Sequence, residues 1–280
     1  MAKFDFRKIT TATRKYNFHT HTQFCDGHST IDEFCKAAVS MGFEHLGFTP
    51  HSPVPLSTPC NMSIEDVTTY IAEVRRAAEQ YPRLHLYTSM EIDYLGDDWG
   101  ASSPWFEALP LDYTISSVHF IPDLDGKPVD IDGPVERFRR ILAENFDGDF
   151  QTLVTTFFRQ SSQMVRTGGF DLIGHFDKIV HNAAVVDPQL EEHPWFTRQL
   201  DALVDLIIVS RVAVEINTKY FDERNRSFPH QRLFRRLAEA GVTLVINSDA
   251  HRAALLNAGR DKAFAILDAI KPVNTPATLQ

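Results

Sequence analysis

Seven short apolar segments run through this chain, and most of them end in a side chain that can bind a metal ion. The expected strands are residues 16–18, 46–49, 84–90, 113–118, 170–174, 212–216 and 242–246. Helical patterns separate them at 34–41, 63–80, 135–167 (with a break near 147–149), 195–210, 229–240 and 260–270. Strands that alternate with helices indicate a parallel sheet, because parallel neighbours need a crossover connection.

Local signals set several of these boundaries. Thr30 and Glu33 form a capping-box pattern at the start of the first helix, and Gly42 is placed to end it. The segment 123–132 is rich in Pro, Gly and Asp and is expected to be a loop. The tail 271–280 is expected to be disordered.

The side chains at the strand ends decide between an open sheet and a barrel. In a barrel the carboxyl ends of the strands converge on one mouth, whereas an open sheet spreads them along an edge. A shared site needs convergence. The sequence therefore predicts an α/β fold with a single domain over residues 1–280, a (β/α)7 TIM-like barrel whose core spans about residues 15–270. The ligand-type residues are His19, His21, Asp26, His51, Glu91, His119, His175, Asp249 and His251.

These nine residues predict a cluster of metal ions. His19 and His21 are two residues apart on a strand, so both imidazoles point to the same face. Each of the nine also has an ordinary reading as a turn, core or capping residue, but one shared cause explains all of them. Six histidines and three carboxylates exceed the three or four protein ligands of one catalytic zinc. We therefore expect two or three divalent transition metals (zinc, iron or manganese), with Glu91 as the bridge.

Two ligand assignments stay open at this stage. His28 competes with Asp26 for one position, because both lie in the same Gly-containing turn. Cys25 is a soft ligand beside the site and remains an alternative. The remaining histidines are expected at the surface or in the core: His45, His85, His181, His193 and His230.

Charge and composition limit the partners. Asp and Glu total 37 against 28 Lys and Arg, a net charge of −9, which argues against a long nucleic acid or an anionic membrane surface. A small anionic substrate is still allowed, because bound divalent metals would reverse the sign of the field locally. No apolar run approaches the ~18 residues of a membrane span. Three cysteines without zinc-finger spacing, and no apolar leader, predict a cytoplasmic protein. The chain is expected to be a monomer or a small homo-oligomer.

The ordered set of motifs resembles the PHP (polymerase and histidinol phosphatase) family of metal-dependent phosphoesterases. The matching segments, in family order between about residues 17 and 252, are HTHTQFCDG, LGFTPHSP, MEIDY, DYTISSVHF, LIGHFDKI, VEINT and INSDAHR. The pair SSVH and GHFDK looks more like the stand-alone histidinol-phosphatase branch than the polymerase-associated branch. The resemblance implies a distorted seven-stranded barrel and a trinuclear site held by the nine strand-end residues. Pro50 departs from the family, whose members often carry Asp there.

The resemblance also implies an activity, the hydrolysis of L-histidinol phosphate to L-histidinol and phosphate in histidine biosynthesis. A hydroxide held between two metals would attack phosphorus in line. The candidate catalytic residues are His251, His175, Asp249 and Asp177. The proton donor to the leaving alkoxide stays open among His251, His175 and a metal-bound water. The candidate phosphate- or substrate-binding residues are Arg252, Arg224, Arg226, Lys178 and Ser117, of which Lys178 could equally be a surface lysine. Two other functions stay open: a phosphoesterase for nucleotides or other small esters, and a non-catalytic metal-binding module.

Overall fold

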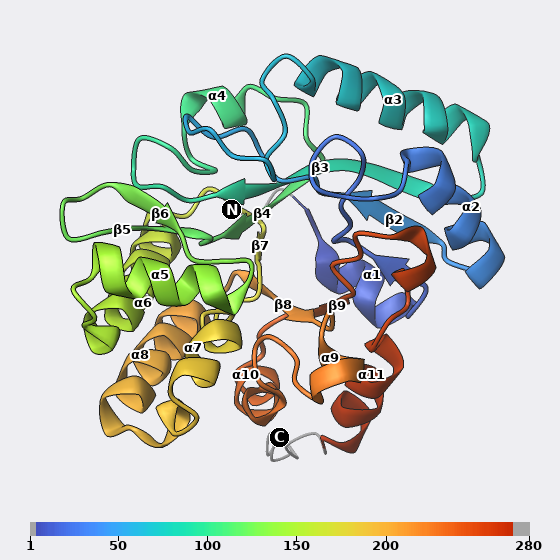
Figure 1. Cartoon of the computed structure of the whole chain (residues 1–280). Helices are drawn as coiled ribbons and strands as arrows, with labels where there is room; N and C mark the ends of the chain where they lie inside the picture. Colours follow the sequence, from blue (N-terminus) through green and yellow to red (C-terminus); the bar gives the residue numbers. More distant parts are fainter. Residues whose placement is uncertain (1–3, 271–280) are drawn as a thin grey trace.

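A computed structural model describes residues 4–270 of the chain, and seven parallel strands form a nearly closed barrel in it (Figure 1). Each strand pairs in parallel with the next one in this order. The strands are β1 (Tyr16–Asn17), β2 (His45–Phe48), β3 (His85–Asp93), β4 (Tyr113–Ser117), β7 (Leu172–Ile173), β8 (Ala213–Asn217) and β9 (Leu244–Asn247). The predicted seven-stranded α/β barrel is confirmed.

Helices surround this sheet (Figure 1). They are α1 (Phe6–Ala12), α2 (Ile31–Met41), α3 (Val67–Gln80), α4 (Pro104–Glu107), α5 (Val135–Asn145), α6 (Phe150–Thr167), α7 (Val180–Val186), α8 (Pro194–Ser210), α9 (Phe221–Arg224), α10 (Phe234–Glu239) and α11 (Arg260–Ala269). Short 3-10 helices occupy Leu190–Glu192, Gln231–Leu233 and Ala253–Leu255. α2 and α3 pack on β2 and β3, whereas α6 and α8 pack together beside β7 and β8. None of the helices within residues 4–270 is long and apolar enough to cross a membrane.

The local signals act largely as expected. Both hydrogen bonds of the capping box at Thr30 are present, and Gly42 ends α2 in the left-handed conformation with a φ of 76°. The predicted break near 147–149 separates α5 from α6. The helix expected from residue 63 begins four residues later, at Val67, because Ser63 bonds to Asp66 in a turn.

Two parts of the chain differ from expectation. The predicted loop at 123–132 contains the turn and the second strand of an antiparallel hairpin, formed by β5 (Phe120–Pro122) and β6 (Pro128–Asp130). Each strand of this hairpin has only three residues, too few to show an alternating pattern. The helix expected at 229–240 is a 3-10 turn followed by the shorter α10. The tail 271–280 lies outside the described residues.

Side chains, rather than a continuous strand ladder, close the barrel between β1 and β9. Within the described chain, the parallel contact at this seam is the single bridge between Thr20 and Ala250. Below that bridge, the side-chain oxygen of Asn247 accepts a hydrogen bond of 2.8 Å from the backbone N–H of Phe18. The residues that follow β1 and β9 are therefore brought together across a seam with few backbone bonds.

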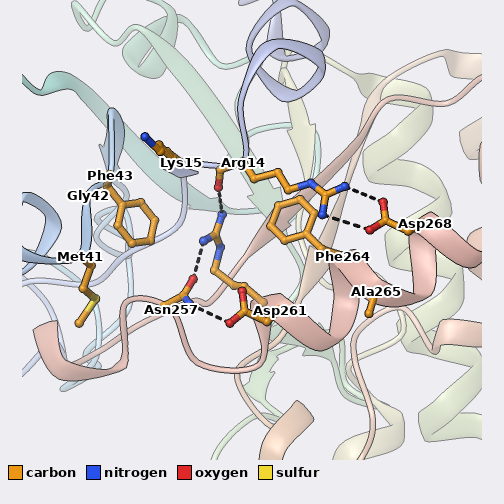
Figure 2. A pocket seen from close by; sticks show the side chains of 11 residues that line it. Arg14, Lys15, Met41, Gly42, Phe43, Asn257, Asp261, Phe264, Ala265 and Asp268 are labelled. Carbon is orange, nitrogen blue, oxygen red and sulfur yellow. Dashed lines mark hydrogen bonds and ion pairs between the residues drawn. The ribbon is translucent and has the colours of Figure 1, made fainter.

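Arg260 of α11 joins the two sides of this seam. Its buried guanidinium donates to the backbone carbonyls of Tyr16, of Arg14 (3.1 Å) and of Ile246 (3.4 Å). Burial lowers the pKa of Arg260 to about 10. A cavity of about 450 Å³ lies beside it, where Arg14 pairs with Asp268 at 2.6 Å (Figure 2). Three rings lie over the guanidinium carbon: Phe43 at 5.0 Å, Tyr16 at 5.3 Å and Phe264 at 5.4 Å.

Candidate metal centre

His19 and His21, directly after β1, point to the same place. Their Nε2 atoms are 3.1 Å apart, as expected for residues two apart on extended backbone. The carboxylate oxygen Oε2 of Glu91 lies 3.2 Å from Nε2 of His19 and 3.4 Å from Nε2 of His21. His51, which follows β2, places Nδ1 3.3 Å from the same oxygen. Three imidazoles from two strand ends therefore surround one buried carboxylate oxygen.

The second oxygen of Glu91 faces the other side of the barrel. Its Oε1 lies 2.8 Å from Nε2 of His175 and 3.6 Å from Nε2 of His119. These histidines follow β7 and β4. A carboxylate with two such neighbourhoods has the geometry of a bridging ligand, the role that the sequence predicted for Glu91.

A third group of ligand atoms lies toward the mouth of the barrel. Oδ1 of Asp26 is 3.3 Å from Nε2 of His251, 3.7 Å from Nδ1 of His21 and 3.9 Å from Nε2 of His51. Asp26 lies among these imidazoles, whereas His28 belongs to none of the ligand groups found in residues 4–270. The geometry therefore favours Asp26 over His28.

Asp249 completes the set after β9. Its backbone has a φ of +49°, which is unusual for a residue other than glycine. Its Oδ1 lies 3.1 Å from Nε2 of His21 and 3.4 Å from Nδ1 of His251. All nine predicted ligands thus surround one centre.

The donor atoms fit metal ions chemically. Within the described residues, four buried atoms of the centre have no hydrogen-bond partner: Asp26 Oδ1, His119 Nε2, His175 Nε2 and Asp249 Oδ1. A buried polar atom without a partner costs about 1–3 kcal/mol, a penalty that a bound cation removes. Imidazole nitrogens mixed with carboxylate oxygens suit zinc, iron and manganese. Ligand atoms gather within 4.8 Å of one another in several overlapping groups, as a site for more than one ion requires.

Carboxylates behind the ligands orient them. Oε1 of the buried Glu215 lies 2.6 Å from Nδ1 of His19, and Oδ1 of Asp93 lies 2.6 Å from Nδ1 of His119. Each carboxylate fixes the proton on Nδ1 and leaves Nε2 turned toward the centre. The sequence argument missed Glu215, although a charged residue inside the apolar run of β8 was a usable signal. Ser117, proposed for substrate binding, donates to Oε1 of Glu91 at 2.6 Å instead.

These carboxylates control the protonation of the ligands. Burial alone would lower the pKa of His19, but Glu215, Glu91 and Asp249 outweigh it and raise the pKa to about 10. Burial alone would also lower the pKa of His119, but the carboxylates of Asp93 and Glu91 outweigh burial and raise this pKa to about 9. A metal must displace the proton from a ligating nitrogen, so protons and metal ions compete at this centre.

Two of the three arginines predicted to bind phosphate contact other side chains. Arg226 lies 2.6 Å from Glu191 and 3.1 Å from Asp177, and Arg224 lies over the ring of Tyr220. None of Arg224, Arg226, Arg252, Lys178 and Ser117 lines the cavity above the centre.

Asp177 and Lys178 are both buried, and each forms an ion pair. Burial raises the pKa of Asp177 to about 6, and this carboxylate also accepts from the backbone of His230 at 2.9 Å. Lys178 is 9% exposed and lies 2.7 Å from Asp132, so it is not a surface lysine. Asp132 raises its pKa against the effect of burial.

A cavity of about 220 Å³ opens above the centre. Asp26, His51 and His251 form part of its wall. Its wall also includes the acids Asp130 and Asp132 and the ammonium of Lys219. Lys219 was not among the predicted residues, although it follows a strand end as the ligands do.

The chain is similar to known proteins in sequence and in fold. The profile of the family described as "PHP domain" matches residues 17–219. A Deinococcus radiodurans protein named "probable histidinol-phosphatase" is 28% identical over 261 residues, 91% of each chain. The structure of a presumed histidinol phosphatase from Listeria monocytogenes superposes with a TM-score of 0.77 at 19% identity, covering 88% of this chain and 99% of that one. A Lactococcus lactis histidinol phosphate phosphatase, solved with zinc, L-histidinol and phosphate, gives a TM-score of 0.67 at 17% identity, covering 93% and 95%.

Proposed function

The chain belongs to the PHP domain family, and from this membership we propose that it is a metal-dependent phosphatase that hydrolyses L-histidinol phosphate to L-histidinol and phosphate. The observation that carries the proposal is the convergence of nine ligand-type side chains, Glu91 among them, on one centre below an open cavity. The names of the relatives support the choice of ester. As an enzyme of histidine biosynthesis it would act in the cytoplasm, as a monomer or a small homo-oligomer.

The nine residues would hold two or three divalent ions of zinc, iron or manganese. Such ions lower the pKa of water to near neutral and neutralise phosphate oxygens. The protein supplies the rest of the site. Glu215 and Asp93 hold the rings of His19 and His119 with Nε2 toward the centre, so that little reorganisation remains when substrate binds.

Two histidines were candidates to protonate the leaving alkoxide. His175 is buried and directs Nε2 at Glu91, so it does not reach the cavity. His251 lines the cavity and is the better placed of the two.

Phosphate release from a panel of esters tests this function. The panel contains L-histidinol phosphate, a nucleoside monophosphate, a nucleoside bisphosphate and p-nitrophenyl phosphate. We expect two or three metal ions per chain by elemental analysis, loss of activity on full chelation, and a kcat/KM for L-histidinol phosphate at least tenfold above the others. Activity that survives chelation would refute the metal mechanism, and a preference for nucleotides would refute the substrate. A fully metal-loaded protein that hydrolyses none of the esters would be a binding module.

A further inference from the structure

Lys219 brings a cationic group to the mouth of the metal centre. It follows β8, two residues after Asn217, and its Nζ lies 3.3 Å from Nε2 of His251 and 3.5 Å from Oδ2 of Asp249. The side chain is 24% exposed and lines the cavity, so an incoming solute can reach the ammonium. The backbone N–H of Lys219 donates to the side chain of Asn217 at 3.1 Å, which fixes the start of this loop.

The other cations of this region have close carboxylate partners. Arg137 lies 2.7 Å from Asp130, and Lys178 lies 2.7 Å from Asp132. Each of these charges is already balanced by an ion pair of short N–O distance. Lys219 differs, because its carboxylate partner is at 3.5 Å.

The partners of Lys219 are themselves metal-ligand candidates. Asp249 and His251 both belong to the set of nine, and an ion bound to them would draw on the same negative charge that attracts the ammonium. An ammonium beside divalent cations is repelled unless an anion lies between them. A phosphoryl group carries about two negative charges at neutral pH and meets this requirement.

We propose that Lys219 binds the phosphoryl group of the substrate, with Nζ donating to a non-bridging oxygen. This inference rests on the proposed phosphatase function, because it takes the anion to be a phosphate. Lysine binds phosphate as a point charge and does not need the fork of an arginine. Lys219 thus takes the role for which the sequence offered Arg224, Arg226 and Arg252.

The test measures phosphate binding directly. Lys219→Met and the control Lys262→Met remove the same charge, and Lys262 is an exposed residue of α11 that pairs with Asp222 at 3.1 Å. Inorganic phosphate is titrated calorimetrically into each zinc-loaded protein, and bound zinc is counted. We expect Lys219→Met to keep its zinc and to bind phosphate about 10- to 100-fold more weakly, the factor expected for one charge-assisted hydrogen bond. Lys219→Arg should stay within a few-fold of the original protein, and Lys262→Met should be unchanged.

Two outcomes would overturn the inference. Unchanged phosphate affinity in Lys219→Met, with zinc retained, would show that the ammonium does not contact phosphate. Loss of zinc in both Lys219→Met and Lys219→Arg would show that the lysine only supports Asp249. Neither reading depends on which ester the enzyme prefers, so a failure of the proposed substrate would be seen separately in the ester panel.

Discussion

Replacing Glu215 by glutamine tests whether the buried carboxylate organises the metal centre. Glu215 accepts four hydrogen bonds. Its Oε1 accepts from Nδ1 of His19 (2.6 Å) and Nδ2 of Asn247 (3.1 Å). Its Oε2 accepts from the backbone N–H of His175 (3.1 Å) and Nδ2 of Asn217 (3.2 Å). Glu215→Gln keeps the shape of the side chain, but its NH₂ group must face two donors in either orientation.

The cost follows from these two orientations. With NH₂ in place of Oε2, the backbone N–H of His175 loses its acceptor and cannot turn away. With NH₂ in place of Oε1, the ring of His19 must move its proton to Nε2, the nitrogen that faces Glu91. A buried donor left without a partner costs about 1–3 kcal/mol. Loss of a carboxylate behind a metal-binding histidine typically weakens metal affinity by about 10- to 100-fold.

The assay has two parts. Zinc affinity is measured by competition with a chelator, and the free energy of unfolding of the metal-free protein is measured in urea. In Glu215→Gln we expect the zinc affinity to fall by about 10- to 100-fold. We expect the free energy of unfolding to fall by about 1–3 kcal/mol. The control Glu239→Gln, at a half-exposed site on α10 whose partner Arg235 is 3.6 Å away, should leave both unchanged. A Glu215→Gln protein that binds zinc within twofold of the original would refute this account of Glu215.

Arg260→Met keeps the aliphatic stem but removes the donors to four oxygens, so we expect the free energy of unfolding in urea to fall by about 2–4 kcal/mol; an unchanged value would show that other contacts hold the seam. Burial lowers the pKa of His181 and of His230 to about 4, so the unfolded chain takes up protons near pH 6.5 that the folded chain resists. Their contribution to stability is therefore present above pH 6.5 and lost as the pH falls to 4, and His181→Phe should flatten this dependence in urea titrations. Asp26→Asn should lower the number of bound metal ions by elemental analysis and His28→Asn should not, whereas the reverse result would place the ligand at His28.

The sequence sufficed for residues whose position follows from topology alone. His19, Glu91 and His175 were predictable because a parallel barrel brings every strand end to the same mouth, whatever the details of packing. Glu215 and Lys219 were missed although their positions in and after β8 were visible in the sequence, because their roles depend on which way each side chain points after β8 pairs with β9. The hairpin β5–β6 and the shortened α10 were missed because three- and six-residue elements carry too little periodicity to be read from sequence.

The metal centre lies at the seam between β1 and β9, where few backbone hydrogen bonds join the strands. Metal binding should therefore reduce the local opening of this seam. His19 and His21 come from β1, and Asp249 and His251 come from the end of β9, so ions bound by both pairs would cross-link the strands that lack a ladder. A bound ion opposes any opening that separates its ligands. Amide hydrogen exchange should therefore slow on zinc binding at the seam, for example at the N–H of His21, which donates 2.9 Å across it to Ala250.

The same experiment contains its own control. Residues Ser89–Asp93 of β3 are already joined to β4 by a continuous ladder of backbone hydrogen bonds. The amides of β3 and β4 should therefore gain less protection from exchange on zinc binding than the amides of the seam. Arg260→Met should enlarge the difference, because it weakens the seam without touching a ligand. Equal slowing of exchange in β3, β4 and the seam would mean that zinc stabilises the fold as a whole, and that the barrel is already closed without it.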